Sequence, residues 1–207
     1  MVHTLGVCGV ILAAGESSRM GRDKALLPWP PQAAQGASGS TFLSAAINLF
    51  APYVDVVLVV VGKNERNLMP VVYANGASLV VNPEPERGQF SSMQTGLQEV
   101  LNRGRDAALI TLVDRPPVAT ATVEAIESAF ERALRNGKWA VVPEHQGKHG
   151  HPILAGREMI EAFLKASPLS SARDVMHAHG DKVVYIPVED PHAVANVNTP
   201  EEYAALT

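Results

Sequence analysis

Short apolar runs rich in Val, Ile and Leu alternate along the chain with longer stretches in which apolar residues return every three or four positions. The short runs lie at residues 5–13, 54–61, 77–81, 107–113, 139–142 and 182–188. The longer stretches lie at residues 41–50, 92–102, 120–136, 157–165 and 172–178. The first pattern is typical of strands buried on both faces and the second of amphipathic helices. Their alternation predicts crossover units around a mostly parallel sheet.

Two segments interrupt this alternation. Residues 144–150 (EHQGKHG) are turn-forming and lie between two apolar runs, which predicts a hairpin whose second strand is 151–154. Residues 28–40 (PWPPQAAQGASGS) have little to bury and predict a long loop, which is either a tolerated insertion or a lid. The expected fold is a three-layer α/β/α sandwich with a Rossmann-like, mostly parallel sheet and a short antiparallel element near residues 144–154.

Size and composition limit the classes of protein that fit. A chain of 207 residues, 46% of them apolar, can bury one sizeable core, so we expect residues 1–207 to form a single domain. Seventeen basic and twenty-one acidic residues give a net charge of -4, so the overall charge does not attract nucleic acid and any affinity for phosphate must be local. The single cysteine, Cys8, excludes an internal disulfide and a cysteine metal cluster, and its apolar neighbours predict a buried strand residue.

The chain shows no signal for export or membrane insertion. No basic segment followed by an apolar run opens it, and no run approaches the roughly 20 apolar residues of a membrane span. We therefore expect a soluble, unprocessed, cytoplasmic protein with neither membrane nor nucleic acid among its partners.

The first predicted strand leads into a segment suited to phosphate. Ala13, Ala14 and Gly15 follow the strand directly, and small residues leave backbone amides open to an anion. Three cations then follow close together, at Arg19, Arg22 and Lys24. Ligands of wound sheets collect at the carboxyl ends of strands, so these charges are placed to meet a triphosphate.

This loop differs from the well-known phosphate and nucleophile loops. It has neither the G-x-G-x-x-G spacing of dinucleotide-binding proteins nor the G-x-x-x-x-G-K-[ST] spacing of P-loop ATPases. The G-x-S-x-G elbow of serine hydrolases is also missing, because the glycine that should follow the serine is absent. The loop therefore argues against a dinucleotide-dependent dehydrogenase, a P-loop kinase and a serine hydrolase.

Residues 12–28 (LAAGESSRMGRDKALLP) closely resemble the opening signature of the MobA-like nucleotidyltransferases, which join CTP or GTP to molybdopterin. A more distant resemblance is to the sugar-phosphate nucleotidyltransferases. The resemblance runs along nearly the whole chain, because four further motifs follow in the family's order. They are RGQFSSMQTG at residues 87–96, VDRP at 113–116, GHP at 150–152 and NVNTP at 196–200.

The resemblance implies a Mg²⁺-dependent enzyme that transfers a nucleoside monophosphate from a nucleoside triphosphate to a phosphorylated acceptor and releases pyrophosphate. Lys24 and Arg19 would neutralise the triphosphate during catalysis. The nucleotide would also contact the backbone segment after the first strand and the start of a later helix. The expected nucleotide-binding residues are Leu12, Ala13, Ala14, Gly15, Arg19, Lys24 and Ser92.

Asp114 follows the predicted strand at residues 107–113, so it should face the same crevice as the glycine loop. From the residues alone it is either a magnesium ligand or a helix cap. The resemblance implies the metal role, with Asn196, the first asparagine of NVNTP, as the second ligand. Arg115 stands where relatives often have glutamine. The resemblance also assigns Gly150, His151 and Pro152 to the acceptor pocket.

Several alternatives stay open. Leu12-Ala-Ala-Gly15 is similar to the CTP users of the family, whereas NVNTP is closer to the GTP users, and we favour CTP because the Ala14 methyl would narrow the space beside the base. The acceptor is expected to be molybdopterin, with a sugar or polyol phosphate as the alternative. The remaining hypothesis is a non-catalytic carrier, which would deliver the molybdenum cofactor to a molybdoenzyme partner.

Overall fold

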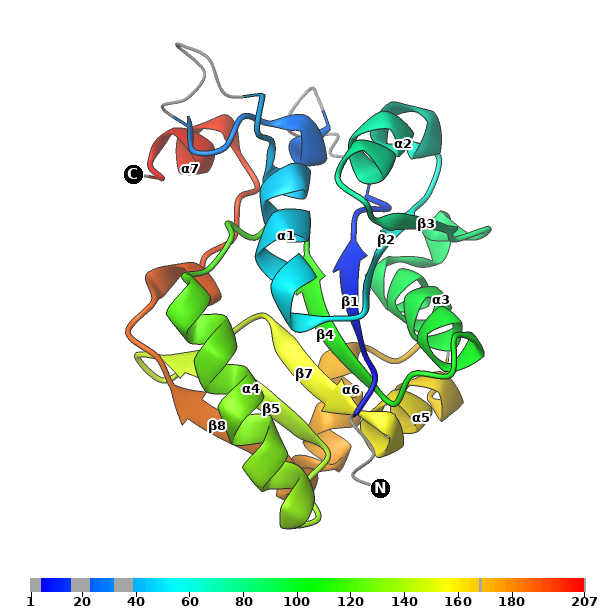
Figure 1. The fold of residues 1–207 in the computed structure, drawn as a ribbon, viewed down its shortest axis with the longest axis vertical. Coiled ribbons are helices and arrows are strands. Elements are labelled where there is room, and N and C mark those ends of the chain that lie inside the picture. Colours follow the sequence, from blue (N-terminus) through cyan, green and yellow to red (C-terminus); the bar gives the residue numbers. More distant parts are fainter. Residues whose placement is uncertain (1–4, 16–22, 32–38, 168, 207) are drawn as a thin grey trace.

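The computed structural model describes residues 5–15, 23–31, 39–167 and 169–206, which form an eight-stranded sheet covered by helices on both faces (Figure 1). The strands are β1 (Val7–Leu12), β2 (Val56–Val61), β3 (Ser78–Val81), β4 (Ala107–Leu112), β5 (Ala140–His145), β6 (Lys148–His149), β7 (Ile153–Gly156) and β8 (Val183–Pro187). Their order is β3-β2-β1-β4-β7-β5-β6, with β8 also paired to β5.

The sheet is mostly parallel with an antiparallel element, as the sequence predicts. Strands β3, β2, β1 and β4 are parallel to one another, β5 is parallel to β8, and β7 runs antiparallel between β4 and β5. The antiparallel partner predicted at residues 151–154 is present as β7, which pairs with β5, although it begins two residues later, at Ile153. The turn at residues 144–150 also forms a short strand of its own, β6, which pairs with the end of β5. Gln146 and Gly147 both have positive φ values, of 50° and 75°, and this tight turn pairs the next two residues with β5.

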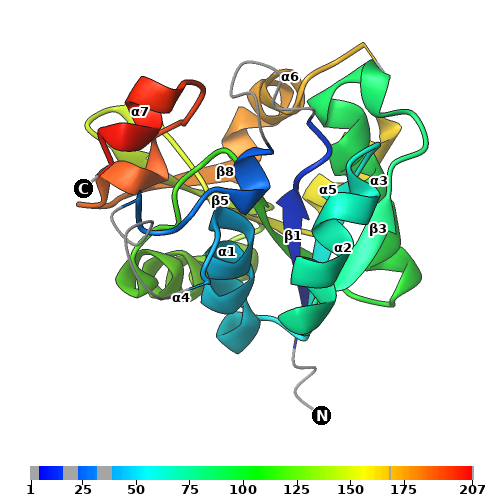
Figure 2. The same ribbon diagram turned by 90° about the horizontal axis from the view of Figure 1, so that it is seen from above.

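Seven helices are present in the described residues. They are α1 (Phe42–Phe50), α2 (Glu65–Ala74), α3 (Gln89–Asn102), α4 (Thr120–Arg135), α5 (Arg157–Lys165), α6 (Ala172–Ala178) and α7 (Pro200–Ala204). Seen from above, α1 and α4 lie on one side of the sheet and α5 and α6 on the other (Figure 2). Short 3-10 turns join several elements: η2 (Lys24–Leu26), η4 (Ala51–Tyr53), η5 (Pro85–Arg87), η6 (Gly180–Lys182) and η7 (Pro191–Ala193).

Helix α2 was not expected from the sequence, because it buries only Leu68 and Val72 and has Pro70 inside it. Helix α3 begins at Gln89, three residues before the predicted start at Ser92, because Gly88 precedes it with a φ of 96°. No helix in the described part of the chain combines the length and the apolar character that crossing a membrane requires.

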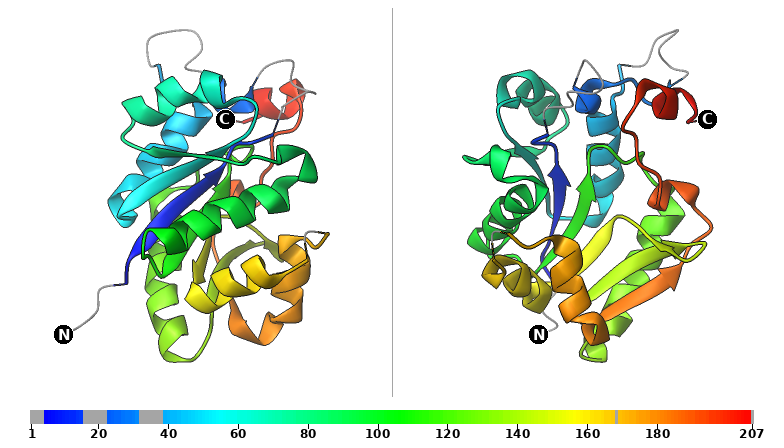
Figure 3. Two further views of the ribbon diagram at one scale, coloured as in Figure 1. Left: turned by 90° about the vertical axis from the view of Figure 1, so that its right-hand side faces the viewer. Right: turned by 180° about the vertical axis from the view of Figure 1, so that it is seen from behind.

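Strand β1 divides the core into two layers because its side chains alternate between the faces of the sheet. Ile11 belongs to the cluster that contains Phe50 of α1, and Val10 belongs to the cluster that contains Leu97 of α3. The view from behind in Figure 3 shows the ribbon of α3 beside that of β1. Cys8 belongs to the second layer and is fully buried, as predicted, and burial raises the pKa of its thiol to about 11. The wound sheet therefore has solid packing on both faces, and its carboxyl edge is where a ligand can bind.

A third, smaller apolar cluster joins the two ends of the chain at that edge. Leu27, Phe42 and Val197 form its buried part, and Trp29 and Tyr203 are among the residues that pack against it. The Tyr203 hydroxyl donates a hydrogen bond of 2.8 Å to the carbonyl oxygen of Pro28. Helix α7 is thereby fixed against the segment that follows η2, next to the carboxyl ends of β1 and β4.

Candidate active site

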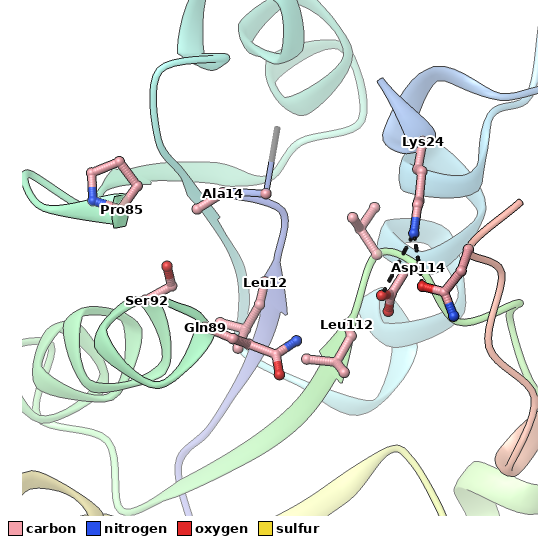
Figure 4. Close-up of a pocket in the computed structure, with 11 residues that line it drawn as sticks. Leu12, Ala14, Lys24, Pro85, Gln89, Ser92, Leu112 and Asp114 are labelled. Atoms are coloured by element: carbon pink, nitrogen blue, oxygen red, sulfur yellow. Dashed lines mark hydrogen bonds and ion pairs between the residues drawn. The ribbon is translucent and has the colours of Figure 1, made fainter. Parts of the chain in front are cut away.

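A pocket of about 240 Å³ opens at the carboxyl ends of β1 and β4 (Figure 4). Its wall combines the end of each strand with side chains from η2, the start of α3 and the segment before α7. The lining residues are Leu12, Ala14, Gly15, Lys24, Pro85, Gln89, Ser92, Leu112, Val113, Asp114 and Asn198. Segments from the beginning, middle and end of the sequence therefore meet at one site, at the edge of the sheet that the sequence predicts.

The segment after β1 contributes three of the four residues that were expected to bind nucleotide there. Leu12, Ala14 and Gly15 line the pocket. Ala13 does not, because its side chain is buried among the core residues on the α1 side. The Ala13 N–H donates to the Val60 carbonyl oxygen at 2.8 Å, so the peptide at this position is part of the sheet. The open backbone of this segment lies at Ala14 and Gly15.

Lys24 is held in the pocket by η2. The Asp23 side chain accepts a hydrogen bond from the Ala25 N–H at 3.1 Å and so caps this short turn. Lys24 is only 9% exposed, and its Nζ lies 3.3 Å from Asn198 Oδ1 and 3.9 Å from Asp114 Oδ2. Figure 4 shows its side chain pointing toward Asp114 on the side of the pocket opposite Ser92. The predictions for Arg19 and Arg22 fall outside the described residues.

Asp114 follows β4 and is the acidic side chain of the pocket. Its Oδ1 atom is buried and has no hydrogen-bond partner among the described residues. Burial raises the pKa of this carboxyl group, and the nearby positive charges of Lys24 and Arg115 oppose that rise. A buried carboxylate oxygen without a partner is costly, so it marks a position where a cation or a donor from a ligand would bind favourably.

Arg115, which departs from the family pattern, does not line this pocket. Its Nη1 donates to the carbonyl oxygen of Ala195 at 3.2 Å. Burial lowers the pKa of its guanidinium, and the negative charge of Asp114 opposes that shift. Arg115 therefore supports the backbone before α7 and adds positive charge beside Asp114.

The structure places Asn198, rather than Asn196, beside Asp114. Val197 lies between the two asparagines, is 1% exposed, and donates its N–H to the Asp114 carbonyl oxygen at 2.8 Å. This bond and the burial of Val197 fix the direction of the segment, which leaves Asn196 exposed and puts Asn198 in the pocket. The side-chain amide in the pocket is thus that of Asn198, two residues after the expected Asn196.

The start of α3 forms the opposite wall. Ser92, which was expected here, lines the pocket, and its Oγ accepts a hydrogen bond of 3.0 Å from Asn82 Nδ2. Gln89 and Pro85 also line the pocket, although they were not predicted from the sequence. Gln89 was overlooked because the predicted helix began three residues too late. A helix that starts beside a pocket favours a negatively charged ligand.

Gly150, His151 and Pro152 do not line this pocket, although they were expected to bind the acceptor. A Cβ atom on Gly150 would lie 2.1 Å from the Ala193 carbonyl oxygen, and the His151 N–H donates to that same oxygen at 2.8 Å. The His151 ring lines a separate small cavity beside Phe50. The structure thus shows packing roles for this motif, and any contact with an acceptor would have to involve a surface outside the pocket described.

The oxygen atoms around Lys24 suit a hard divalent cation. Asp114 offers a carboxylate and Asn198 an amide oxygen on the same side of the pocket. No group of three or more His, Cys, Asp or Glu side chains able to hold a metal occurs in the described ranges. Mg²⁺ commonly binds one or two protein oxygens together with substrate phosphates and water, so this donor set fits it.

A sequence model described as the MobA-like NTP transferase domain matches residues 9–183. The chain belongs to this family. It is 26% identical over 196 residues to the molybdenum cofactor cytidylyltransferase of Escherichia coli (strain K12), covering 94% of this chain and 92% of that one. It is also 26% identical over 208 residues to the probable molybdenum cofactor guanylyltransferase of Mycobacterium avium (strain 104), covering 100% and 98%.

Solved structures agree with the fold of a MobA-like transferase. Rv0371c from Mycobacterium tuberculosis H37Rv superposes with a TM-score of 0.79 at 23% identity, covering 99% of this chain and 98% of that one. The Rv0371c complex with manganese has a TM-score of 0.72 at 21% identity, covering 97% of each chain. The family and fold expected from the sequence motifs are therefore confirmed, and the protein is a nucleotidyltransferase.

Proposed function

We propose that this MobA-like transferase moves a nucleoside monophosphate from a nucleoside triphosphate, preferably CTP, to the terminal phosphate of molybdopterin or the molybdenum cofactor, with Mg²⁺. The observation that carries the proposal is the convergence of Lys24, Asp114 and Asn198 beside the open backbone at Ala14 and Gly15. These three side chains bring a cation, a carboxylate and an amide oxygen together, which suits a substrate that carries its own phosphate charge. A nucleotidylated product would then be passed to a molybdoenzyme.

In the reaction, a terminal phosphate oxygen of the acceptor attacks the α-phosphorus of the triphosphate. The bond from that phosphorus to the oxygen bridging to the β-phosphate breaks, and pyrophosphate leaves with the electron pair. The protein needs no covalent intermediate, so its contribution is alignment and stabilisation of charge. A bound Mg²⁺ would supply additional positive charge where negative charge develops on the phosphates.

Each described residue has a role that follows from its position. Lys24 is buried with its ammonium in the pocket, so it can neutralise a phosphate without first losing a full hydration shell. Asp114 and Asn198 present the oxygen atoms that would hold Mg²⁺ against the same phosphates. The backbone of Ala14 and Gly15, opposite Gln89 and Ser92, leaves room for the nucleoside.

CTP is proposed as the donor because Ala14 lines the pocket, where its methyl group takes space beside a base. A smaller pyrimidine suffers less from this narrowing, and one methyl group discriminates by about 1 to 3 kcal/mol. The cytidylyltransferase and guanylyltransferase relatives are equally identical to this chain, at 26%, so identity does not choose between CTP and GTP.

The test is turnover of α-labelled CTP and GTP by the purified protein with Mg²⁺ and molybdopterin or molybdenum cofactor. We expect pyrophosphate release together with transfer of label to the acceptor, faster with CTP. A preference for GTP would overturn the choice of base. Transfer only to sugar or polyol phosphates would overturn the acceptor. Nucleotide or cofactor binding with no pyrophosphate released from any combination would instead support a carrier.

A further inference from the structure

Asn64, at the start of α2, makes its side-chain hydrogen bonds to residues outside its own helix. Asparagine at a helix N-cap usually accepts a hydrogen bond from a backbone N–H in the first turn. Asn64 occupies the N-cap of α2, but its side chain makes no such bond. Its Oδ1 accepts instead from the Gly62 N–H at 3.2 Å, which turns the Nδ2 group toward the neighbouring strand β1.

The two hydrogens of Nδ2 connect the two segments that flank the glycine-rich loop. One is donated to the Ala13 carbonyl oxygen at 2.9 Å, where β1 ends. The other is donated to Asp23 Oδ2 at 2.8 Å, immediately before η2. One amide group therefore holds the end of β1 and the start of the Lys24 turn at a fixed separation.

Asp23 transmits this constraint to Lys24. Its Oδ2 atom binds Asn64, while its Oδ1 atom caps η2 through the Ala25 N–H at 3.1 Å. Lys24 is the first residue of η2, and its Nζ reaches Asp114 and Asn198 in the pocket. Ala13 has a second anchor in its own bond to Val60, so loss of the Asn64 amide would act mainly on the Asp23 side.

We infer that Asn64 is a positioning residue for nucleotidyl transfer, which acts by holding Asp23 and thereby fixing the Lys24 ammonium against the triphosphate. This inference rests on the function proposed above. Asn64 does not line the pocket, so it acts without touching the substrate. Its effect is one of geometry, and a misplacement of about 1 Å at a reacting centre lowers rates by roughly 100-fold.

A double-mutant cycle tests the inference, using Asn64→Ala, Lys24→Ala and the double variant, assayed for pyrophosphate release. With Lys24 present, Asn64→Ala should lower kcat/KM by about 10- to 100-fold. With Lys24 already removed, the same change should lower it less than about twofold, because coupled residues are not additive. Equal losses in both backgrounds, or no loss in either, would overturn the inference.

Asn75→Ala is the matched control. Asn75 follows the other end of α2, and its Nδ2 also donates to a backbone carbonyl oxygen, that of Val71, at 2.8 Å. Both substitutions remove one asparagine amide from the same helix, so both should lower the melting temperature by a similar amount. Only Asn64→Ala should change turnover, and a comparable loss of activity in Asn75→Ala would assign the effect to helix stability.

Asn64→Asp provides a second readout if the alanine variant is poorly folded. The new carboxylate would lack the two N–H donors of Nδ2 and would repel the Asp23 carboxylate, so activity should fall at neutral pH. At lower pH the two carboxyl groups can share one proton, which restores a single hydrogen bond. We expect the activity of this variant relative to wild type to rise as the pH is lowered, and a constant ratio would count against the inference.

Binding measurements separate this inference from the proposed function. If the wild-type protein turns over no triphosphate, the proposed function fails, and calorimetry with Mg-CTP and with cytidine still tests Asn64. Asn64→Ala should then weaken the binding of Mg-CTP about 10-fold and leave that of cytidine unchanged. Equal affinity of wild type and variant for Mg-CTP would overturn the positioning role.

Discussion

Lys24 and Asp114 face one another on one side of the pocket, with Lys24 Nζ 3.9 Å from Asp114 Oδ2, although they come from segments far apart in the sequence. The distance is longer than a hydrogen bond, and the other carboxylate oxygen is buried without a partner among the described residues. The two groups are therefore close enough to act on one ligand, and Asp114 Oδ1 can accept a bond from it.

Asp114→Asn should abolish turnover and leave the fold intact. The substitution keeps the shape of the side chain but removes its charge, so we expect kcat to fall by at least about 100-fold. Because burial raises the pKa of Asp114, the ionised carboxylate destabilises the folded state at neutral pH. The melting temperature of the variant should therefore be no lower than that of wild type.

Asp106→Asn is a suitable control for charge removal. Asp106 precedes β4 at the other end of the strand, and its Oδ1 pairs with Arg157 Nη2 at 2.7 Å. We expect normal pyrophosphate release from this variant and near-complete loss from Asp114→Asn. Comparable activity in the two variants would show that Asp114 has no part in the reaction.

Asn198→Ala and Asn196→Ala should separate the two asparagines of the NVNTP motif. Only Asn198 lines the pocket and lies within 3.3 Å of Lys24 Nζ. We expect Asn198→Ala to lower kcat/KM by at least about 10-fold, as loss of one polar contact to a charged group costs roughly 1.5 to 3 kcal/mol. Asn196→Ala should change it less than twofold. The reverse ranking, measured by titrating Mg²⁺ and triphosphate, would restore Asn196 as the candidate ligand.

Gly150→Ala should destabilise the fold, because the new Cβ would lie 2.1 Å from the Ala193 carbonyl oxygen and a backbone atom cannot move aside cheaply. Overpacking of this kind costs about 1 to 3 kcal/mol and sometimes more. Gly180→Ala is the control, since nothing lies within 4 Å of the Cβ built at that position. Urea unfolding of both variants measures the difference, and equal midpoints would be inconsistent with the described packing.

His151 should make the fold sensitive to acid. Burial, with a smaller contribution from the positive charge of Arg115, lowers the pKa of its imidazole to about 3. In the unfolded chain the imidazole has a pKa of about 6.5 and becomes protonated as the pH falls below that value. The folded state does not bind this proton, so a falling pH favours the unfolded state. The free energy of unfolding should fall by up to about 1.4 kcal/mol per pH unit, until the folded state is protonated as well.

His151→Gln removes the titrating group and keeps a polar side chain near the Ile110 carbonyl oxygen, which lies 3.4 Å from His151 Nδ1. Chemical unfolding of wild type and variant between pH 7.5 and 4.5 gives the comparison. Wild type should lose stability faster than the variant over this interval. Parallel stability curves would mean that His151 titrates normally in the folded protein.

The apolar runs predicted the sheet well because a strand covered on both faces must be apolar at nearly every position. The six runs correspond to β1, β2, β3, β4, β5 and β8, and the family motifs led directly to the pocket at Leu12, Lys24 and Asp114. Helix α2 escaped detection because it lies largely at the surface, with only two buried residues to mark its face. Local patterns thus indicated most elements and the edge of the sheet that carries the site.

The direction of single side chains was harder to predict. Val197 bonds to Asp114 and packs against Phe42, and this anchoring puts Asn198 in the pocket and leaves Asn196 exposed. Both contacts involve segments remote in sequence. Ala13 was expected in the pocket because it is small, but the pleat of β1 turns it into the core. Such positions are decided by tertiary contacts rather than by residue type.

The attachment of α7 to the segment after η2 also bears on synthesis of the protein. Asn198 and Tyr203 leave the ribosome long after β1, β4 and Lys24, so only then can Asn198 join the pocket wall and Tyr203 bond to Pro28. A nascent chain ending before residue 196 would have the sheet and Lys24 but would lack the Asn198 amide and the Tyr203 contact to Pro28. Nucleotide binding by such a chain would therefore lag behind folding of its sheet.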